Sequence, residues 1–395
     1  QDQIRLSASS SNLLWNYSCI EGIRSVSISD DGSLITASTY SVDSRVYLFD
    51  NVASASKTPV WNYTAPNSVY SADISADGSY IAGVDDSQHI FLLNNSIADP
   101  KLPMWVFSPT GGVMNDALIS DDGNYIVAAS SAGVVFLLNS SIESPKTEMW
   151  SYATGGQIWS VAISADGTYI AVASHDSHLY LFNKASSTPL WDYPAGGLVQ
   201  SVAISADGNY IVAGTSDSKV HLFSRTSSTP IWTFSADNVV YTVAISSDGN
   251  YIISGGEDNT VYLFERSSST PLWNYTATDQ FGADDRPRCV AISANGDYIA
   301  AGSHDYNIFL FEKASSIPLW NHTTGGEISC IAISEDGAYI VAGDTNGGIH
   351  LLYNEITSGT TQNIPFANLF ILFAVATVLT IILIKKSITQ IKMKI

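Results

Sequence analysis

Hydrophobic and polar residues alternate along most of this chain with a period of two. Within residues 198–234, four short segments rich in β-branched and aromatic residues read LVQSVAIS, NYIVAGT, KVHLF and PIWTF. A period of two is typical of β-strands, whereas an amphipathic helix repeats every 3.6 residues. We therefore expect four antiparallel strands here. The first two meet at the turn Asp207-Gly208, because glycine accepts the positive φ that a tight turn needs.

This four-strand unit recurs along the chain. Residues 160–182, 201–223 and 242–264 are near copies, and the motif I-S-x-[DN]-G occurs eight times with glycines 41 to 47 residues apart. That period is typical of propeller blades. A fourth-type strand (13–18) begins the chain, and the last repeat ends after a third-type strand (348–353). The pattern predicts an all-β, eight-bladed β-propeller with four-stranded antiparallel blades, closed by its N-terminal strand.

The repeat also resembles known propeller families. The unit V-A-I-S-x-D-G-x-Y-I-A-x-G-S-x-D-x-x-V-Y-L-F resembles the WD40 repeat. The following S-S-x-T-P-L-W-x-Y segment is similar to the Trp-docking motif of quinoprotein-type propellers. The resemblance covers residues 13–353 and implies the same ring of blades. Leu222-Phe223 and its equivalents replace the Trp-Asp ending of a WD40 repeat, and the Gly-His pair is missing. The resemblance thus implies a fold and leaves the function open.

Each repeat carries a tryptophan on its fourth strand, usually with another aromatic residue two positions later. Residues i and i+2 of a strand share a face, so this pair is expected to pack against the neighbouring blade. The predicted blade-docking residues are Trp15, Trp61, Trp105, Trp150, Trp191, Trp232, Trp273 and Trp320. The residue between the two aromatic residues is then expected to face solvent at the rim of the ring.

Six N-x-S/T sequences are acceptor patterns for N-linked glycans. The predicted glycosylation sites are Asn16, Asn62, Asn94, Asn139, Asn274 and Asn321. Four of them occupy the rim position after the tryptophan: Asn16, Asn62, Asn274 and Asn321. These four belong to blades eight, one, six and seven, which are neighbours in a closed ring. We expect a glycan-bearing arc over these blades, extended partway by Asn94 and Asn139, and a barer arc around blades four and five for lateral partners.

The C-terminal end has the composition of a membrane anchor. Residues 364–384 form an uncharged apolar stretch, long enough to cross a hydrocarbon layer of ~30 Å as one helix. A basic tail (385–395) follows, and positive residues remain cytoplasmic. We expect a linker (354–363) to hold the propeller outside the cell, with its Asp-Gly edge toward the bilayer. The N-terminal extension (1–12) has no apolar leader, which we interpret as removal of a signal peptide.

Charge and cysteine content exclude some functions. Without the four lysines of the tail, 13 basic residues face 37 acidic ones, so nucleic acid is not expected as a partner. Three cysteines allow at most one disulfide bond. Cys289 and Cys330 fall in the same column of neighbouring repeats, where they would either form a bridge or serve as small buried side chains, the interpretation that we favour.

One repeat breaks the regular spacing through a longer top-face loop at residues 276–290, which concentrates charge. It is either a binding loop or a tolerated surface insertion. Its candidate binding residues are Gln280, Phe281, Asp284, Asp285, Arg286 and Arg288. The aspartates of the Asp-Gly turns have Ca²⁺-ligand chemistry, but single carboxylates on separate blades lie too far apart to share an ion. We therefore expect turn-forming aspartates, with no metal and no cofactor.

The sequence contains no Gly-x-Ser-x-Gly motif, no phosphate-binding loop and no convincing triad. It also lacks the vicinal cysteine pair that quinoprotein dehydrogenases need. We predict a non-catalytic, membrane-anchored glycoprotein of the cell surface, typical of an archaeal envelope, which binds partners on its outward top face. Two versions stay open: a self-assembling coat or filament component, and a receptor or accessory subunit of a membrane complex. A quinoprotein-like enzyme is the less favoured alternative.

Overall fold

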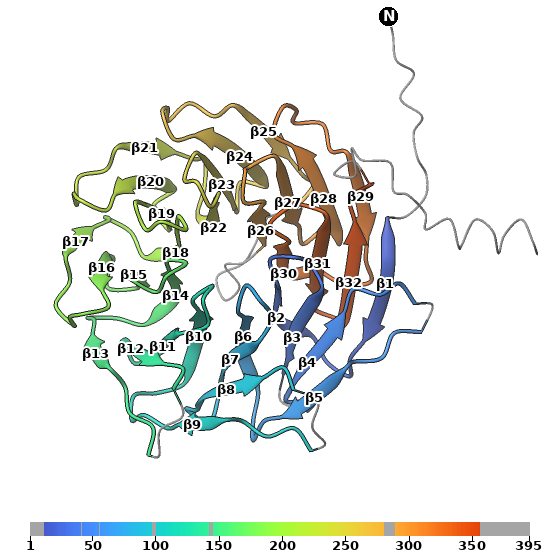
Figure 1. Cartoon of the computed structure of the whole chain (residues 1–395). Helices are drawn as coiled ribbons and strands as arrows, with labels where there is room; N and C mark the ends of the chain where they lie inside the picture. Colours follow the sequence, from blue (N-terminus) through green and yellow to red (C-terminus); the bar gives the residue numbers. More distant parts are fainter. Residues whose placement is uncertain are drawn as a thin grey trace, which may run out of the picture. The chain divides into compact units, whose positions relative to one another are not determined.

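Thirty-two strands form eight separate four-stranded antiparallel sheets, arranged as blades around a ring (Figure 1). The computed structural model describes residues 12–40, 42–54, 56–96, 100–141, 145–279 and 289–355. From the innermost strand outward, blades 1 to 4 comprise β2 (Ile23–Ile28), β3 (Leu34–Thr39), β4 (Arg45–Asp50), β5 (Trp61–Thr64); β6 (Val69–Ile74), β7 (Tyr80–Asp85), β8 (Ile90–Asn94), β9 (Trp105–Phe107); β10 (Met114–Ile119), β11 (Tyr125–Ser130), β12 (Val134–Asn139), β13 (Trp150–Ala153); and β14 (Ile158–Ile163), β15 (Tyr169–Ser174), β16 (His178–Asn183), β17 (Trp191–Pro194).

Blades 5 to 8 repeat the same arrangement. They comprise β18 (Val199–Ile204), β19 (Tyr210–Thr215), β20 (Lys219–Ser224), β21 (Trp232–Ser235); β22 (Val240–Ile245), β23 (Tyr251–Gly256), β24 (Thr260–Glu265), β25 (Trp273–Thr276); β26 (Val290–Ile292), β27 (Tyr298–Gly302), β28 (Asn307–Glu312), β29 (Trp320–Thr323); and β30 (Ile328–Ile333), β31 (Tyr339–Asp344), β32 (Gly348–Tyr353), β1 (Leu13–Ser18). The predicted eight-bladed fold is therefore confirmed.

The N-terminal strand closes the ring, as the sequence predicts. Strand β1 pairs antiparallel with β32, with Asn16 opposite His350. The Tyr353 amide extends the pairing by donating to the Asn12 carbonyl at 2.7 Å. Blade 8 is thus built from both ends of the propeller sequence. The closure leaves no open blade, which removes a strand edge that would otherwise pair with other chains.

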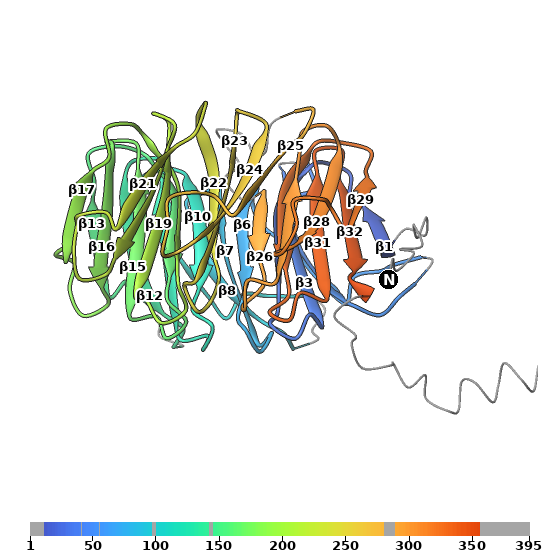
Figure 2. The same cartoon turned by 90° about the horizontal axis from the view of Figure 1, so that it is seen from above.

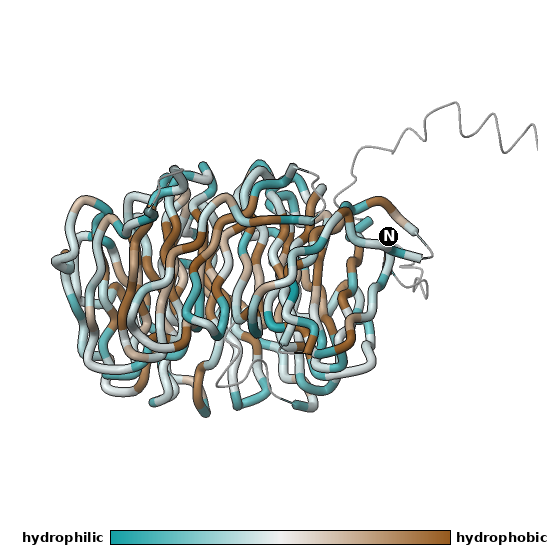
Figure 3. The backbone as a smooth tube through the Cα atoms, turned by 90° about the horizontal axis from the view of Figure 1, so that it is seen from below, coloured by the Kyte–Doolittle hydropathy of each residue, from teal (hydrophilic) through white to brown (hydrophobic). Residues whose placement is uncertain are grey.

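Apolar residues fill the spaces between blades rather than one central core. Each hydrophobic cluster combines residues of two adjacent blades, as when Trp15 of blade 8 packs with Phe49 of blade 1. Figure 3 shows hydrophobic residues along the strands and hydrophilic residues at many of the turns. The strands run between two edges of the ring (Figure 2). We call the edge with the Asp-Gly turns the bottom, and the opposite edge the top.

The bottom turns share one hydrogen-bond pattern that explains the I-S-x-[DN]-G motif. In blade 4 the buried Ser164 hydroxyl donates to Asp166 at 2.9 Å and accepts from the Tyr169 amide at 3.0 Å. Gly167 has a φ of +68°, and a Cβ there would lie 2.3 Å from the Tyr125 ring of blade 3. Glycine is therefore required both by the backbone conformation and by the close approach of the preceding blade.

A closed ring of backbone hydrogen bonds joins these eight turns. In each blade an amide of the turn donates to a turn carbonyl of the next blade, and blade 8 donates back to blade 1. The bonds run from Asp30 to Ala76, Ala76 to Asp121, Asp122 to Ala165, Ala165 to Ala206, Ala206 to Ser247, Ser247 to Ala294, Ala294 to Glu335 and Glu335 to Asp30, at 2.9 to 3.4 Å. This ring satisfies polar groups that face the centre and fixes the blades relative to each other.

By its contacts, the chain divides into residues 1–354 and 355–395. The part of the chain that the structure describes contains no helix long and apolar enough to cross a membrane. The predicted transmembrane segment (364–384) and the basic tail (385–395) lie outside the described residues. The membrane anchor therefore stays a prediction from the sequence.

Candidate functional site: blade junctions, rim and top centre

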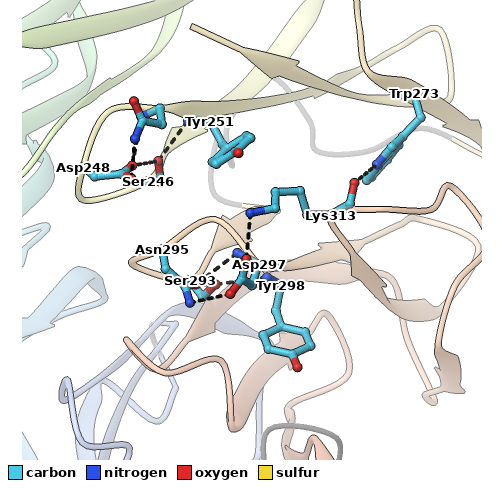
Figure 4. Close-up of polar contacts among 10 residues, drawn as sticks. Ser246, Asp248, Tyr251, Trp273, Ser293, Asn295, Asp297, Tyr298 and Lys313 are labelled. Carbon is cyan, nitrogen blue, oxygen red and sulfur yellow. Dashed lines mark hydrogen bonds and ion pairs between the residues drawn. The ribbon is translucent and has the colours of Figure 1, made fainter.

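The eight repeat tryptophans pack against the following blade. Trp273 of blade 6 lies with its ring centroid 5.3 Å from that of Phe311 in blade 7. Its indole N–H donates to the Lys313 carbonyl at 2.8 Å (Figure 4). Equivalent tryptophans contact the hydrophobic cluster of the next blade at every junction: Trp15, Trp61, Trp105, Trp150, Trp191, Trp232, Trp273 and Trp320. Their function is structural.

A basic residue reinforces most of these junctions, a feature that the sequence reasoning missed. Lys313 lies with its Nζ 4.4 Å from the Tyr251 ring centroid of blade 6 and 2.7 Å from Asp297 (Figure 4). The hydrogen bond to Asp297 raises the pKa of Lys313 above its usual value. In blades 4 to 7 the base follows the third strand and covers a tyrosine of the preceding blade. These bases are Lys184, Arg225, Arg266 and Lys313.

In blades 1 to 3 the basic residue lies at a different place in the loop and covers a different residue of the preceding blade. Their third and fourth strands are joined by longer loops, and a lysine from each loop lies over the docking tryptophan of the preceding blade. The three are Lys57, Lys101 and Lys146, with Nζ 4.3 to 5.1 Å from the indole ring. Thus seven of the 13 basic residues outside the tail hold blades together. A base seven or four residues before seven of the eight repeat tryptophans, all except Trp15, was the available sequence signal.

The structure separates the six sequons into two groups. Four asparagines on the outermost strands are exposed and alternate with inward aromatic residues: Asn16, Asn62, Asn274 and Asn321. The other two, Asn94 and Asn139, are half-buried at the ends of third strands. Their side-chain oxygens accept hydrogen bonds from Lys101 at 3.2 Å and Lys146 at 2.5 Å. The rim asparagines are therefore far more accessible for modification.

The six candidate binding residues of the insertion, Gln280, Phe281, Asp284, Asp285, Arg286 and Arg288, lie outside the described residues. The segment before them is tied to blade 7, where Thr278 donates to Asp305 at 2.6 Å. Cys289, directly after them, is buried, and neither it nor Cys330 is in a disulfide bond. The interpretation of these two cysteines as small buried side chains is therefore the correct one.

The repeated aspartates serve their own turns. The Ser79 hydroxyl donates to Asp77 at 2.6 Å and lowers the pKa of that carboxyl group. Deeper at the bottom centre, burial and the negative charges of Asp30, Asp73 and Glu335 raise the pKa of Asp121 to about 6. Among the described residues, no group of three histidine, cysteine or acidic side chains is placed to hold a metal ion.

At the top centre of the ring, one position of the innermost strands differs from blade to blade. The innermost strands are similar in sequence: a serine, threonine, aspartate or cysteine is followed by an aliphatic residue, one further residue and the Ile-Ser of the turn motif. The position before this run changes from blade to blade. In blades 1 to 6 and blade 8 it holds Arg24, Tyr70, Asn115, Trp159, Gln200, Tyr241 and Ser329. We call the residues of blades 1 to 6 at this position the top-centre ring.

Side-chain contacts hold several residues of the top-centre ring in place. The Arg24 guanidinium lies between two phenol rings, 4.4 Å from the Tyr40 centroid and 4.3 Å from the Tyr70 centroid, and donates to the Tyr40 hydroxyl at 2.8 Å. On blade 4 the Trp159 indole N–H donates to His175 Nδ1 at 2.9 Å. The other ring nitrogen of His175 lies 3.1 Å from Gln200 Oε1. None of these residues was among the predicted binding residues.

Comparisons with known proteins agree with this architecture. The family described as "WD domain, G-beta repeat" matches residues 12–50, 228–265, 276–312 and 316–351. The family described as "Outer membrane protein assembly factor BamB" matches residues 103–238. The chain contains WD40 and BamB-like β-propeller repeats. The predicted resemblance to WD40 and quinoprotein-type repeats is confirmed at this level.

These WD40 and BamB-like repeats also have a structural counterpart. The crystal structure of the computationally designed Ika8 protein is similar, with a TM-score of 0.71 and 11% sequence identity over 85% of this chain and 98% of that one. At this identity the likeness supports the propeller fold alone. None of the curated proteins compared with the chain matches it.

Proposed function

We propose that this protein is a membrane-anchored, N-glycosylated propeller of the cell surface that binds a partner molecule on its outward top face without catalysing a reaction. The top-centre ring is the observation that carries this proposal. Innermost strands that are otherwise similar in sequence place polar and aromatic side chains of several kinds at this position. Selection for folding alone would favour the same residue in every blade, so blade-specific chemistry is typical of a binding surface.

The direction in which the propeller faces follows from its bottom edge. The third strand of blade 8 ends at Tyr353, and the amide of Asn354 donates to Ala338 beside a bottom turn. Only about ten residues of linker separate this point from the apolar stretch at 364–384. We therefore infer that the bottom faces the bilayer and the top faces outward. The exposed rim asparagines agree with an extracytoplasmic location because glycan addition needs accessible asparagine side chains.

A second candidate is an accessory subunit of a membrane protein complex. The family that matches residues 103–238 is described as an outer membrane protein assembly factor, which favours this version over a self-assembling coat. In that case a protein partner would bind along blades 2 to 5, which carry no rim asparagine at the glycan position. A quinoprotein-like enzyme is the least supported alternative, because the sequence lacks the vicinal cysteine pair of quinoprotein dehydrogenases and no group of three histidine, cysteine or acidic side chains among the described residues is placed to hold a metal ion.

Surface labelling tests the proposal. Intact cells expressing the full chain with separate tags after residue 12 and at the C-terminus would be treated with a membrane-impermeant protease. We expect loss of the N-terminal tag, protection of the C-terminal tag until the membrane is permeabilised, and a mass decrease on deglycosylation. Protection of both tags in intact cells would refute the extracytoplasmic location. Loss of the protein to the soluble fraction would refute the anchor.

A further inference from the structure

Exposed apolar side chains line the outer part of the bottom edge. The loops from the third to the fourth strand lie there, and in blades 2 to 7 each loop exposes one large apolar side chain by 44% to 72%. Twelve large apolar side chains among the described residues are at least 36% exposed, and half of them belong to these six loops. We call the six residues the apolar collar: Leu102, Met149, Leu190, Ile231, Leu272 and Ile317.

The backbone holds these residues at fixed places. In blades 4 to 6 the collar residue directly precedes the docking tryptophan, and its amide donates to a third-strand carbonyl at 2.7 Å. Neighbouring residues of an extended segment point to opposite sides. The tryptophan packs against the next blade, so the collar residue points outward, on the same side as the residue two positions later. That later residue is polar in all three blades: Asp192, Thr233 and Asn274. Folding therefore accepts polar residues on this side, and the bottom position does not have to be apolar.

The chain ends its last strand at the same edge. Strand β32 ends at Tyr353, and the amide of Asn354 donates to the Ala338 carbonyl at 2.7 Å beside a bottom turn. Residues 355–363 form the linker to the apolar stretch, and nine residues span at most about 30 Å when fully extended. A membrane that holds the apolar stretch would thus lie within about 30 Å of this edge. Such a short tether gives the collar a high effective concentration at the bilayer.

We propose that the apolar collar rests on the bilayer that holds the anchor, with its six side chains in the headgroup region. The propeller then stands on its bottom edge and keeps its top centre turned away from the membrane. This inference rests on the proposed function, because it needs the anchor at 364–384 and the outward orientation of the top face. It adds that the folded ring itself, and not the tether alone, contacts lipid.

The distribution of the collar favours a bilayer over a protein partner. The collar extends over six of the eight blades, and a plane of lipid reaches all of them at once. A protein interface of standard size covers about 800 Å² on each partner and would leave part of the collar exposed. The same loops carry partly exposed bases in blades 4 to 7, and apolar residues beside bases are typical of segments that lie in a membrane interface. These bases are Lys184, Arg225, Arg266 and Lys313.

Charge decides which lipids the collar should prefer. The bottom turns carry exposed aspartates, among them Asp166, Asp207 and Asp248. The residues before the tail also have a large excess of acids over bases. Anionic headgroups would therefore repel the bottom edge. We expect the collar to rest on neutral, zwitterionic lipid and to leave the surface as the anionic fraction rises.

Fluorescence quenching on the full chain in phosphatidylcholine liposomes tests the proposal. One fluorophore is attached at Thr188→Cys, in the loop of Leu190, and in a second preparation at Thr110→Cys, in a top loop; both positions are exposed. Cys19→Ser removes the partly exposed native thiol from both. A lipid with a quencher on its headgroup shortens the fluorescence lifetime of a label at the surface. We expect a large quenched fraction for the bottom label and none for the top label.

Two matched triple variants separate the collar from the tether. Leu190→Ser, Ile231→Ser and Leu272→Ser together should lower the ratio of quenched to free bottom label about thirtyfold, at about threefold for each half-exposed side chain. The control makes the same change at three exposed apolar residues of the top edge, Ile20→Ser, Val42→Ser and Leu198→Ser, and should leave the ratio unchanged. Melting temperatures would show that both variants fold. Replacing a third of the lipid by phosphatidylglycerol should lower the ratio in the unmodified protein.

Liposome flotation on the same samples separates failure of the collar from failure of the proposed function. If the chain floats with the vesicles but the bottom label is unquenched, or is quenched equally in the folded collar variant, the collar does not bind lipid and the anchored surface protein stands. Stronger quenching with phosphatidylglycerol would overturn the proposal as well, because the bases would then be the cause. A chain that does not float refutes the anchor, and with it this inference. Quenching of the top label alone refutes the outward top face.

Discussion

Replacing Gly296 by alanine should destabilise the propeller through a contact between two blades. Gly296 lies in the bottom turn of blade 7 with a φ of +73°. A Cβ atom there would lie 2.3 Å from Cδ2 of Tyr251 in blade 6. The Tyr251 ring cannot move away freely, because Lys313 lies over it at 4.4 Å (Figure 4). The substitution therefore strains the turn and the blade junction together.

Two terms give the magnitude. The left-handed conformation costs a residue with a Cβ atom about 1 to 2 kcal/mol, and overpacking against a constrained ring costs about 1 to 3 kcal/mol. The sum is about 2 to 5 kcal/mol. With an unfolding entropy of about 2.1 cal/mol/K per residue over about 340 residues, a loss of 3 kcal/mol lowers Tm by about 4 °C if the ring unfolds as one unit.

Gly325 supplies the matched control, because a Cβ atom added there meets no heavy atom within 4 Å. Differential scanning calorimetry of Gly296→Ala and Gly325→Ala would compare the same chemical change in two environments. We expect a clear fall in Tm for the first variant and a change below about 1 °C for the second. Equal melting temperatures would refute the argument that the turn glycine is required by the neighbouring blade.

Three further predictions follow from the other junction and rim residues. Lys313→Met should lower the free energy of unfolding by about 1 kcal/mol, because it removes the cation–π contact and the ion pair. Lys219→Met is the control at an exposed ion pair and should change the free energy of unfolding by less than about 0.5 kcal/mol. Urea denaturation measures both changes. Burial lowers the pKa of His221 to about 4, so the folded protein is favoured fully above pH 6.5 and loses stability as the pH falls toward 4. His221→Phe cannot take up a proton, so the variant should lose up to about 3 kcal/mol less stability between pH 7 and pH 4.5. Thermal melts at the two pH values measure this difference. An unchanged pH profile in that variant would contradict the assignment. Glycopeptide mass spectrometry of protein from its native host should find the rim asparagines modified more fully than the half-buried pair, and even occupancy would contradict the two groups; the rim set is Asn16, Asn62, Asn274 and Asn321.

The sequence predicted contacts that depend on local pattern. Alternation on the fourth strand places Trp273 and Tyr275 on one face and Asn274 on the other, and the structure shows this arrangement. The turn motif likewise predicted the positive φ of its glycine. These features follow from neighbouring residues, because the two-residue period of a strand and the requirements of a tight turn act over only a few positions.

The basic residues of the junctions were missed for a different reason. Lys313 lies seven residues before Trp320, yet its side chain covers Tyr251, which is 62 residues earlier in the chain. The regular spacing was visible, but its meaning depends on which blade packs against which. A charged residue at a repeated position is equally compatible with a solvated turn.

By itself, then, the sequence determined the strands, their number, the turn geometry and the closure of the last blade by residues 13–18. These features could be predicted because one strong local pattern is repeated in every blade. Only the tertiary structure decided the bottom ring of hydrogen bonds and the gathering of Arg24, Trp159 and Gln200 at the top centre. The Ser329 hydroxyl donates to the Ile23 carbonyl at 2.7 Å across 306 residues of chain. Such contacts exist because the ring closes, and no local pattern encodes them.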